Sequence, residues 1–176
     1  MTSPATPAGT RPEAVPSPAP LPVRASRQRP GPAVRTTSLL LGAVDTAPRC
    51  ARATVRDTLA QWDLSHLTDD AQALATELVS NAVAAARRAA PDGTAAVTVW
   101  LTVQHGELCI RVQDPDPTPP PHPWQAPDDD AEHGRGLLIV SELSHRWAWY
   151  PAPAGKFVWA TLLINPDTPE NLMERH

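Results

Sequence analysis

Glu77 and Asn81 are the two residues of this chain whose types and spacing most readily support chemistry. They lie four positions apart in a segment with a helical pattern, so their side chains would lie one above the other on one helix surface. A carboxylate beside a carboxamide can hold a metal-bound phosphate together with a water molecule. The alternative is that Glu77 only caps a solvated flank and Asn81 is incidental, because Glu-x-x-x-Asn is a common accident on helices. The spacing alone leaves both interpretations open.

Two further positions carry groups that would suit a nucleotide. Asp114 ends an alternating, strand-like run, and a carboxylate at a strand end can accept hydrogen bonds from an exocyclic amine. Gly134-Arg135-Gly136 opens a short helical segment, and a helix N-terminus presents free N–H groups and a positive dipole end to phosphate. Here too a structural alternative exists, since Asp114 can simply stop a strand and the two glycines can simply form a turn.

Helical periodicity positions the first two residues. A long helix is predicted from Leu67 to Arg88, because apolar residues recur there at steps of three and four. At 100° per residue, Glu77 and Asn81 fall at the edge of the apolar stripe. A second helix is predicted over Ala47–Gln61, with Thr46 as its expected N-cap. Ser65 or Thr68 is the expected N-cap of the long helix.

Alternating apolar and polar residues predict the strands. A first strand is expected over Arg35–Leu41 and a short helix over Leu137–Leu143. A proline-rich, acidic loop is expected from Asp114 to Glu132, and a loop of that length suggests function rather than mere connection. The remaining strands form two hairpins, Thr94–Val103 with Glu107–Val112 and Arg146–Pro151 with Phe157–Ile164.

The resulting order, β-α-α-β-β-loop-α-β-β, predicts an α+β fold: a two-layer α/β sandwich with a mixed, mainly antiparallel sheet. Residues 1–33 hold nine of the 22 prolines and little large apolar surface, which predicts a disordered tail. The folded domain is expected over residues 34–165, with a flexible C-terminal tail over residues 166–176.

Composition narrows the class of function. A formal charge of -4 and a pI near 5.8 disfavour general nucleic-acid binding. The two cysteines lack the spacing of a zinc site or a disulfide framework. No signal peptide is visible, and no run approaches the roughly 18 apolar residues that would span a bilayer. We therefore expect a cytoplasmic protein without direct contact to membrane or nucleic acid.

Four segments together resemble the GHKL (Bergerat-type) ATPases, and among them the small bacterial anti-sigma-factor serine kinases. The resemblance extends from about Thr37 to Ile164, which is the whole of the predicted domain. Its motifs occur in the family's order: Glu77–Val83 is similar to the N box, Val112–Asp114 to the start of the G1 box, His133–Val140 to the G2 box and Gly155–Ala160 to the closing G3-like strand.

The resemblance implies roles for the residues singled out above. Asn81 would bind Mg²⁺, Glu77 would be the catalytic base, and Asp114 would read the amine of adenine. Nucleotide contacts would come in addition from the G2 segment, with Gly134, Arg135 and Gly136 forming a lid beside the phosphates and Leu137 following them. The implied cofactors are ATP and Mg²⁺. The implied partner is a sigma factor or an anti-sigma antagonist, and a homodimer is a further expectation.

Two departures from the family pattern concern the pocket. The family's G1 box usually continues from its Asp into glycines, whereas here it reads Asp114-Pro115-Asp116-Pro117. Proline fixes φ and removes N–H donors, so this wall is expected to be stiffer. Phe157 falls where many members carry a Thr that helps hold adenine. Both features are expected to weaken ATP binding without changing the fold.

Three functions are consistent with these observations. The first is an ATP-binding regulator that binds a sigma factor or a similar target and phosphorylates a serine on an antagonist protein. The second is a module of the same fold that has lost catalysis and acts by protein contacts alone. A histidine-kinase catalytic domain is third, since it would need an upstream helical hairpin that a proline-rich tail does not supply.

Overall fold

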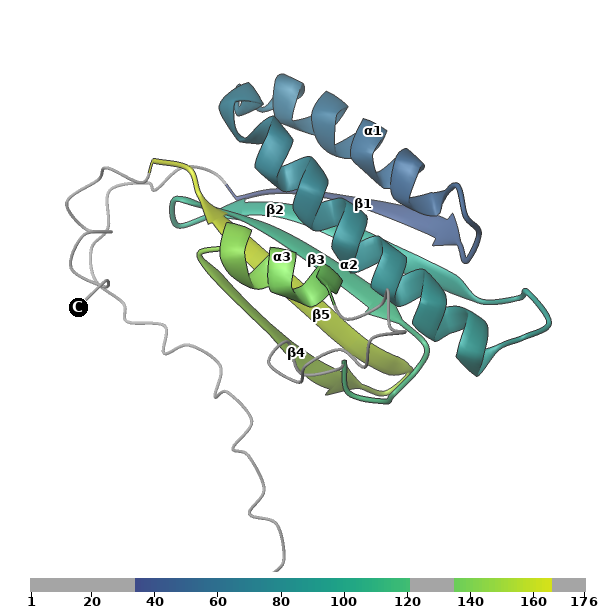
Figure 1. Cartoon of the computed structure of the whole chain (residues 1–176). Coiled ribbons are helices and arrows are strands. Elements are labelled where there is room, and N and C mark those ends of the chain that lie inside the picture. Colours follow the sequence, from purple (N-terminus) through teal and green to yellow (C-terminus); the bar gives the residue numbers. More distant parts are fainter. Residues whose placement is uncertain (1–33, 121–134, 166–176) are drawn as a thin grey trace, which may run out of the picture.

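The computed structural model describes residues 34–120 and 135–165, which form one layer of helices on a five-stranded sheet (Figure 1). The two predicted tails, Gly134 and most of the long predicted loop lie outside the described residues. The elements are β1 (Arg35–Gly42), α1 (Ala47–Gln61), a 3-10 turn η1 (Ser65–Leu67), α2 (Thr68–Ala89), β2 (Ala96–Gln104), β3 (Glu107–Asp114), α3 (Arg135–Leu143), β4 (Arg146–Ala152) and β5 (Gly155–Leu163).

The strands are arranged in the order β1-β2-β3-β5-β4. All four pairings in this sheet are antiparallel, so the predicted α+β sandwich is confirmed, while the parallel pairing of a mixed sheet does not occur in the described residues. The β2–β3 turn uses His105 and Gly106 at φ 51° and 78°, which is the left-handed geometry of a tight hairpin. Insertion of β5 between β3 and β4 brings the C-terminal hairpin against the middle of the sheet.

One face of the sheet and the apolar stripes of α1, α2 and α3 form the core. Alternate residues of β2 and β3 are buried, as a two-residue side-chain period requires when one face meets helices. Leu74, Leu78, Leu101 and Ile110 are among the largest side chains withdrawn from water. Burial of each such side chain contributes about 1.5–3 kcal/mol. This packing fixes the face of α2 on which Glu77 and Asn81 lie.

Both long helices begin without the predicted side-chain caps. Thr46 occupies the N-cap position of α1 but makes no side-chain cap hydrogen bond, and α2 is preceded by Leu67 after the 3-10 turn. Backbone continuity from the 3-10 turn replaces a side-chain cap at α2. Charges complement the dipole of α2 instead, with acidic residues in its first turn and basic ones in its last: Asp69, Asp70, Arg87 and Arg88.

The second face of the sheet carries an aromatic cluster. The Phe157 ring lies 5.0 Å from that of Tyr150 and 5.6 Å from that of Trp100, measured between centroids. The Arg111 guanidinium lies 4.9 Å from the Trp100 centroid, a cation–π contact. Phe157 therefore faces away from the helices.

In the described part of the chain, no helix combines the length and apolar character that crossing a membrane would require.

Candidate functional site

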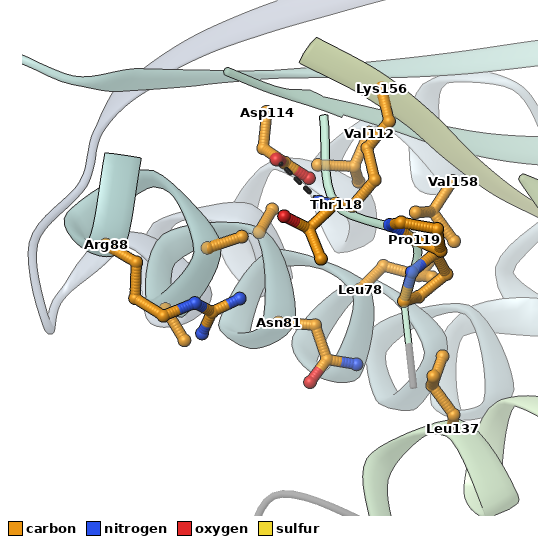
Figure 2. A pocket seen from close by; sticks show the side chains of 14 residues that line it. Leu78, Asn81, Arg88, Val112, Asp114, Thr118, Pro119, Leu137, Lys156 and Val158 are labelled. Carbon is orange, nitrogen blue, oxygen red and sulfur yellow. Dashed lines mark hydrogen bonds and ion pairs between the residues drawn. The ribbon is translucent and has the colours of Figure 1, made fainter. Parts of the chain in front are cut away.

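A cavity of about 340 Å³ lies between α2, the ends of β3 and β5, and the start of α3 (Figure 2). Its walls are mostly apolar, with a few polar side chains at either end, which is the usual character of a small-molecule site. The lining residues are Leu78, Asn81, Ala82, Ala84, Ala85, Arg88, Val112, Asp114, Thr118, Pro119, Pro120, Leu137, Lys156 and Val158.

A buried ion pair forms one end of the cavity. The ammonium Nζ of Lys156 lies 2.9 Å from Oδ1 of Asp114, and the two side chains are only 4% and 1% exposed. The strand register explains the contact, because Asp114 on β3 and Lys156 on β5 are direct cross-strand partners whose side chains point to the helix layer. Figure 2 draws this interaction as a dashed line beside Val112 and Thr118.

The loop after Asp114 is held by a short series of polar contacts. The backbone N–H of Asp116 donates to Asp114 Oδ1 at 2.9 Å, and the N–H of Thr118 donates to Asp116 Oδ1 at 2.9 Å. Lys156 Nζ also donates to the Asp116 carbonyl oxygen at 2.8 Å, and Arg88 contacts Asp116 Oδ2 at 3.3 Å. Aspartates that accept from N–H groups two residues on form local turns, which suit the Pro-rich sequence of this loop.

The two aspartates have pKa values shifted in opposite directions. Burial raises the pKa of Asp114, although Lys156 opposes the shift by donating a hydrogen bond and by its charge. Burial also acts to raise the pKa of Asp116, but hydrogen bonds from Thr118 and the charge of Lys156 outweigh it, so the pKa of Asp116 is lowered. The two carboxylates of one short loop thus differ in their electrostatic environments.

Asn81 lines the other end of the cavity, and Gly136 lies against Asn81 and Glu77 without either Gly136 or Glu77 being part of the cavity wall. A Cβ added to Gly136 would lie 2.6 Å from Glu77 Oε2 and 3.6 Å from Asn81 Oδ1, so the first turn of α3 lies directly against both side chains. Glycine at this position is what permits that approach. The Asn81 Nδ2 group is buried and has no hydrogen-bond partner in the described residues. An unsatisfied buried amide is costly, which suggests that a ligand completes its hydrogen bonds.

The family model of the histidine kinase-like ATPase domain matches residues 42–162, which is more than half of the chain. The chain belongs to the histidine kinase-like ATPase domain family. A comparison with curated proteins gave no match. Among solved structures, the chain is similar to the RsbU and RsbW domains of Rv1364c from Mycobacterium tuberculosis, with a TM-score of 0.51 and 20% identity over 72% of this chain. The match covers 32% of that chain, and the likeness supports the fold.

In this ATPase domain, most of the predicted site residues come together. Asn81, Asp114 and Leu137 line one cavity, and Glu77 and Gly136 lie against each other at its α3 end. Arg135 begins α3, although its side chain lies outside the described residues, as does the whole of Gly134. The roles that the resemblance implies stay predictions: catalysis by Glu77, and ligand contacts by Asn81, Asp114, Gly134, Arg135, Gly136 and Leu137.

The interpretation of Phe157 as a pocket residue is wrong. Its ring lies in the aromatic cluster on the far face of the sheet, and the neighbouring Lys156 enters the cavity instead. The alternation of faces along β5 indicates this placement of Lys156. Val158, Ala160 and Leu162 face the core, and Lys156 lies two residues before Val158, so its side chain lies on the same face. The predicted strand begins at Phe157, one residue after Lys156, so the prediction did not assign Lys156 to the face of the sheet that meets the helices. Arg88, at which the predicted long helix ends, also lines the cavity.

The residues present fit Mg²⁺ bound together with phosphates. Within residues 34–120 and 135–165 no three His, Cys, Asp or Glu gather as a metal cluster. Mg²⁺ in nucleotide sites usually takes one or two protein oxygens, with phosphates and water as the remaining ligands. The amide oxygen of Asn81, which lines the cavity, is a ligand of that kind.

Proposed function

We propose that this domain binds MgATP in the cavity and transfers the γ-phosphate to a serine of an antagonist protein. The observation that carries the proposal is the placement of Asp114 and Asn81 at separate ends of one largely apolar cavity. An adenine edge would contact Asp114, the apolar walls would enclose the ring, and the phosphates would extend toward Asn81 and the start of α3. Membership of the ATPase-domain family supports this orientation.

Glu77 is the proposed general base. It lies beside Gly136 and Asn81, at the end where the γ-phosphate would lie. In the transfer, the serine hydroxyl gives its proton to the Glu77 carboxylate, its oxygen bonds to the γ-phosphorus, and the bond to ADP breaks with ADP taking the electron pair. Bound Mg²⁺ would supply charge neutralisation on the phosphates. Asn81 would hold that ion through its amide oxygen.

The protein partner is proposed from the motif resemblance. The N-box and G2-like segments are similar to those of anti-sigma-factor serine kinases, so we infer a sigma factor or analogous target together with a serine-bearing antagonist. Such a regulator would act in the cytoplasm and would control transcription without touching DNA itself.

One observation favours a second function, a binding module without catalysis. Oδ1 of Asp114 already accepts from Lys156 and from the Asp116 N–H, so a nucleotide must use the remaining oxygen. A domain of this kind would act through protein contacts alone.

Titration with MgATP, followed by phosphotransfer to candidate antagonists, separates the two functions. For the kinase, Glu77→Ala should bind MgATP nearly as the parent does and lose phosphotransfer by about 10²-fold or more. Asn81→Ala should weaken the magnesium-dependent part of binding. Glu142→Ala, which removes an exposed carboxylate of α3, is the matched control and should behave as the parent does. Phosphotransfer unchanged in Glu77→Ala would contradict the base assignment.

A further inference from the structure

Lys156 is a charged group in the cavity to which the motifs assign no role. Its ammonium has three N–H donors. One donates to Asp114 Oδ1 at 2.9 Å and one to the Asp116 carbonyl at 2.8 Å. The third has no acceptor in the part of the chain that the structure describes, and the side chain lines the cavity. A charged donor is therefore available at the base end of the site.

Asp114 offers the matching acceptor. The two hydrogen bonds that it accepts from described residues, from Lys156 and from the N–H of Asp116, end on Oδ1. Oδ2 accepts from no residue within the described ranges, and Asp114 also lines the cavity. An available acceptor and an available donor thus lie side by side on neighbouring strands, at one end of one pocket.

We propose that Lys156 is a second base-reading residue, which donates to N1 of adenine while Asp114 accepts from the 6-amino group. This inference rests on the proposed function, because it specifies how the same site recognises its nucleotide. Adenine presents a donor at its 6-position next to an acceptor at N1. Guanine presents the reverse pattern, a 6-carbonyl next to N1–H. In the same orientation, guanine would direct its carbonyl at the carboxylate and its N–H at the ammonium, so both contacts would be repulsive.

The surroundings hold Lys156 in place for this role. Asp116, whose carbonyl accepts from Lys156, is itself held by the Thr118 N–H and by Arg88. Pro115 and Pro117 restrict the same loop. Gly155 places β5 against the Asp114–Pro115 backbone, where no side chain would fit. Donors that are fixed before the ligand arrives lose less entropy on binding. On this proposal the stiffness of the loop, which the sequence predicts to weaken ATP binding, favours recognition of the base instead.

Stability alone is a poor explanation for the pair. Charges withdrawn from water are costly even when paired, and apolar residues of similar volume often replace a buried ion pair without loss. A carboxylate and an ammonium that are both almost fully buried at the wall of a cavity, each with a hydrogen-bonding position that no described residue uses, are therefore more simply explained by ligand recognition.

Nucleotide analogues test the proposal on the unmodified full chain. ATP, 1-deaza-ATP (in which C–H replaces N1), purine riboside triphosphate (which lacks the 6-amino group) and GTP are titrated calorimetrically with Mg²⁺. We expect 1-deaza-ATP to bind roughly 10- to 150-fold more weakly than ATP, the usual range for a hydrogen bond to a charged group. The analogue without the amino group should show a loss of similar size, and GTP should bind more weakly still.

Variants then assign the N1 contact to its residue. In Lys156→Met, ATP and 1-deaza-ATP should bind within about threefold of each other, because the interaction that distinguishes them is gone. Arg111→Met is the matched control: this cation is on the adjacent strand but on the opposite face, against Trp100 and Phe157. It should keep the full preference for ATP. Thermal unfolding of each variant shows whether it is folded. If Lys156→Met is not folded, the ratio of ATP affinity to 1-deaza-ATP affinity measured on the parent decides the proposal.

The outcomes that overturn the proposal are distinct from those that overturn the function. Equal binding of ATP and 1-deaza-ATP by the parent, with the analogue lacking the amino group rejected, would remove Lys156 as a base reader and leave ATP binding intact. Tighter binding of GTP than of ATP would overturn the adenine assignment. No binding of any of the four at millimolar concentration would overturn the proposed function and this inference together.

Discussion

The Lys156 ammonium and the Asp114 carboxylate are cross-strand partners 2.9 Å apart, and almost none of either side chain is exposed. Each charge is tolerated because the other lies beside it. Removing one partner leaves a buried charge uncompensated, whereas removing both leaves none. The stability of the fold is therefore coupled to the base end of the candidate site.

A double-mutant cycle measures this coupling. Asp114→Leu and Lys156→Met should each lower the free energy of unfolding by about 3–5 kcal/mol, while the double variant should lie within about 1 kcal/mol of the parent. Urea unfolding provides the measurement. The pair of Arg146 and Glu107, with Arg146 56% exposed, is the control, and Arg146→Met should cost about 1 kcal/mol or less. Additive losses in the Asp114–Lys156 cycle would contradict the coupling.

Gly136→Ala should impair catalysis more than folding. The added Cβ would lie 2.6 Å from Glu77 Oε2, the end of a flexible side chain, so the carboxylate can move away while the backbone stays in place. We expect the free energy of unfolding to change by less than about 1 kcal/mol, since Ala also favours the helix by roughly that amount. Phosphotransfer should fall by about tenfold or more because the base is displaced.

Gly42→Ala is the companion variant for Gly136. The nearest atom to its added Cβ is Val44 Cγ1 at 4.0 Å, which is ordinary van der Waals contact, and no atom of Glu77 lies within 4 Å of that Cβ. Its phosphotransfer should equal that of the parent. If Gly136→Ala were as active as Gly42→Ala, the contact between α3 and Glu77 would have no part in the reaction.

Gly155→Ala should destabilise the whole domain. This residue has φ 107°, and its added Cβ would collide with the backbone carbonyl oxygen of Asp114, which cannot rotate away as a side chain can. We expect a loss of at least about 3 kcal/mol, from left-handed strain together with the overlap. Gly106 shares a positive φ but has no atom within 4 Å of an added Cβ, so Gly106→Ala should cost only about 1–2 kcal/mol. Similar losses in thermal unfolding of the two variants would contradict the steric explanation.

Acidification should reveal the opposite shifts of Asp114 and Asp116. The folded-state pKa of Asp116 is below its ordinary value of 3.8, so its stabilising contribution is present above pH 3.8 and is lost as the pH falls through the lowered value. The pKa of Asp114 is raised, so the folded protein binds this proton more readily than the unfolded chain does. Between 3.8 and the raised value, a falling pH therefore stabilises the fold through Asp114.

Two variants separate these contributions. Asp116→Asn should lose less free energy of unfolding than the parent as the pH is lowered below about 4, because the group that must take up a proton is absent. Asp114→Asn should lose more free energy of unfolding than the parent as the pH is lowered toward 3.8. The reason is that the stabilisation gained when Asp114 takes up a proton is absent from this variant. Urea unfolding at a series of pH values from 7 to 3 gives the dependence of the free energy of unfolding on pH for the parent and both variants. A steeper loss in Asp116→Asn than in the parent, or a shallower loss in Asp114→Asn, would refute the assigned pKa shifts.

The amino-acid sequence by itself determined the elements and their types. The predicted helix over Ala47–Gln61 has the bounds of α1, and the hairpin turn at His105-Gly106 lies where it was expected. These features depend on local periodicity and on residues that tolerate left-handed backbone, both of which are readable over a few positions. The predicted side-chain caps do not form: Thr46 occupies the N-cap position of α1 without a cap hydrogen bond, and Leu67 precedes α2.

Tertiary structure alone decided which side chains share the site. Lys156 reaches Asp114 across 42 positions of sequence because the β3–β5 register makes them partners, and Phe157 faces away because successive strand residues alternate between faces. Gly136 approaches Glu77 because α3 packs on α2, a contact between distant segments that no local pattern encodes. The sequence supplied a carboxylate, an amide and glycines in a family order. Long-range strand pairing and helix packing placed a lysine among them, and that is what sets the proposed recognition of the base.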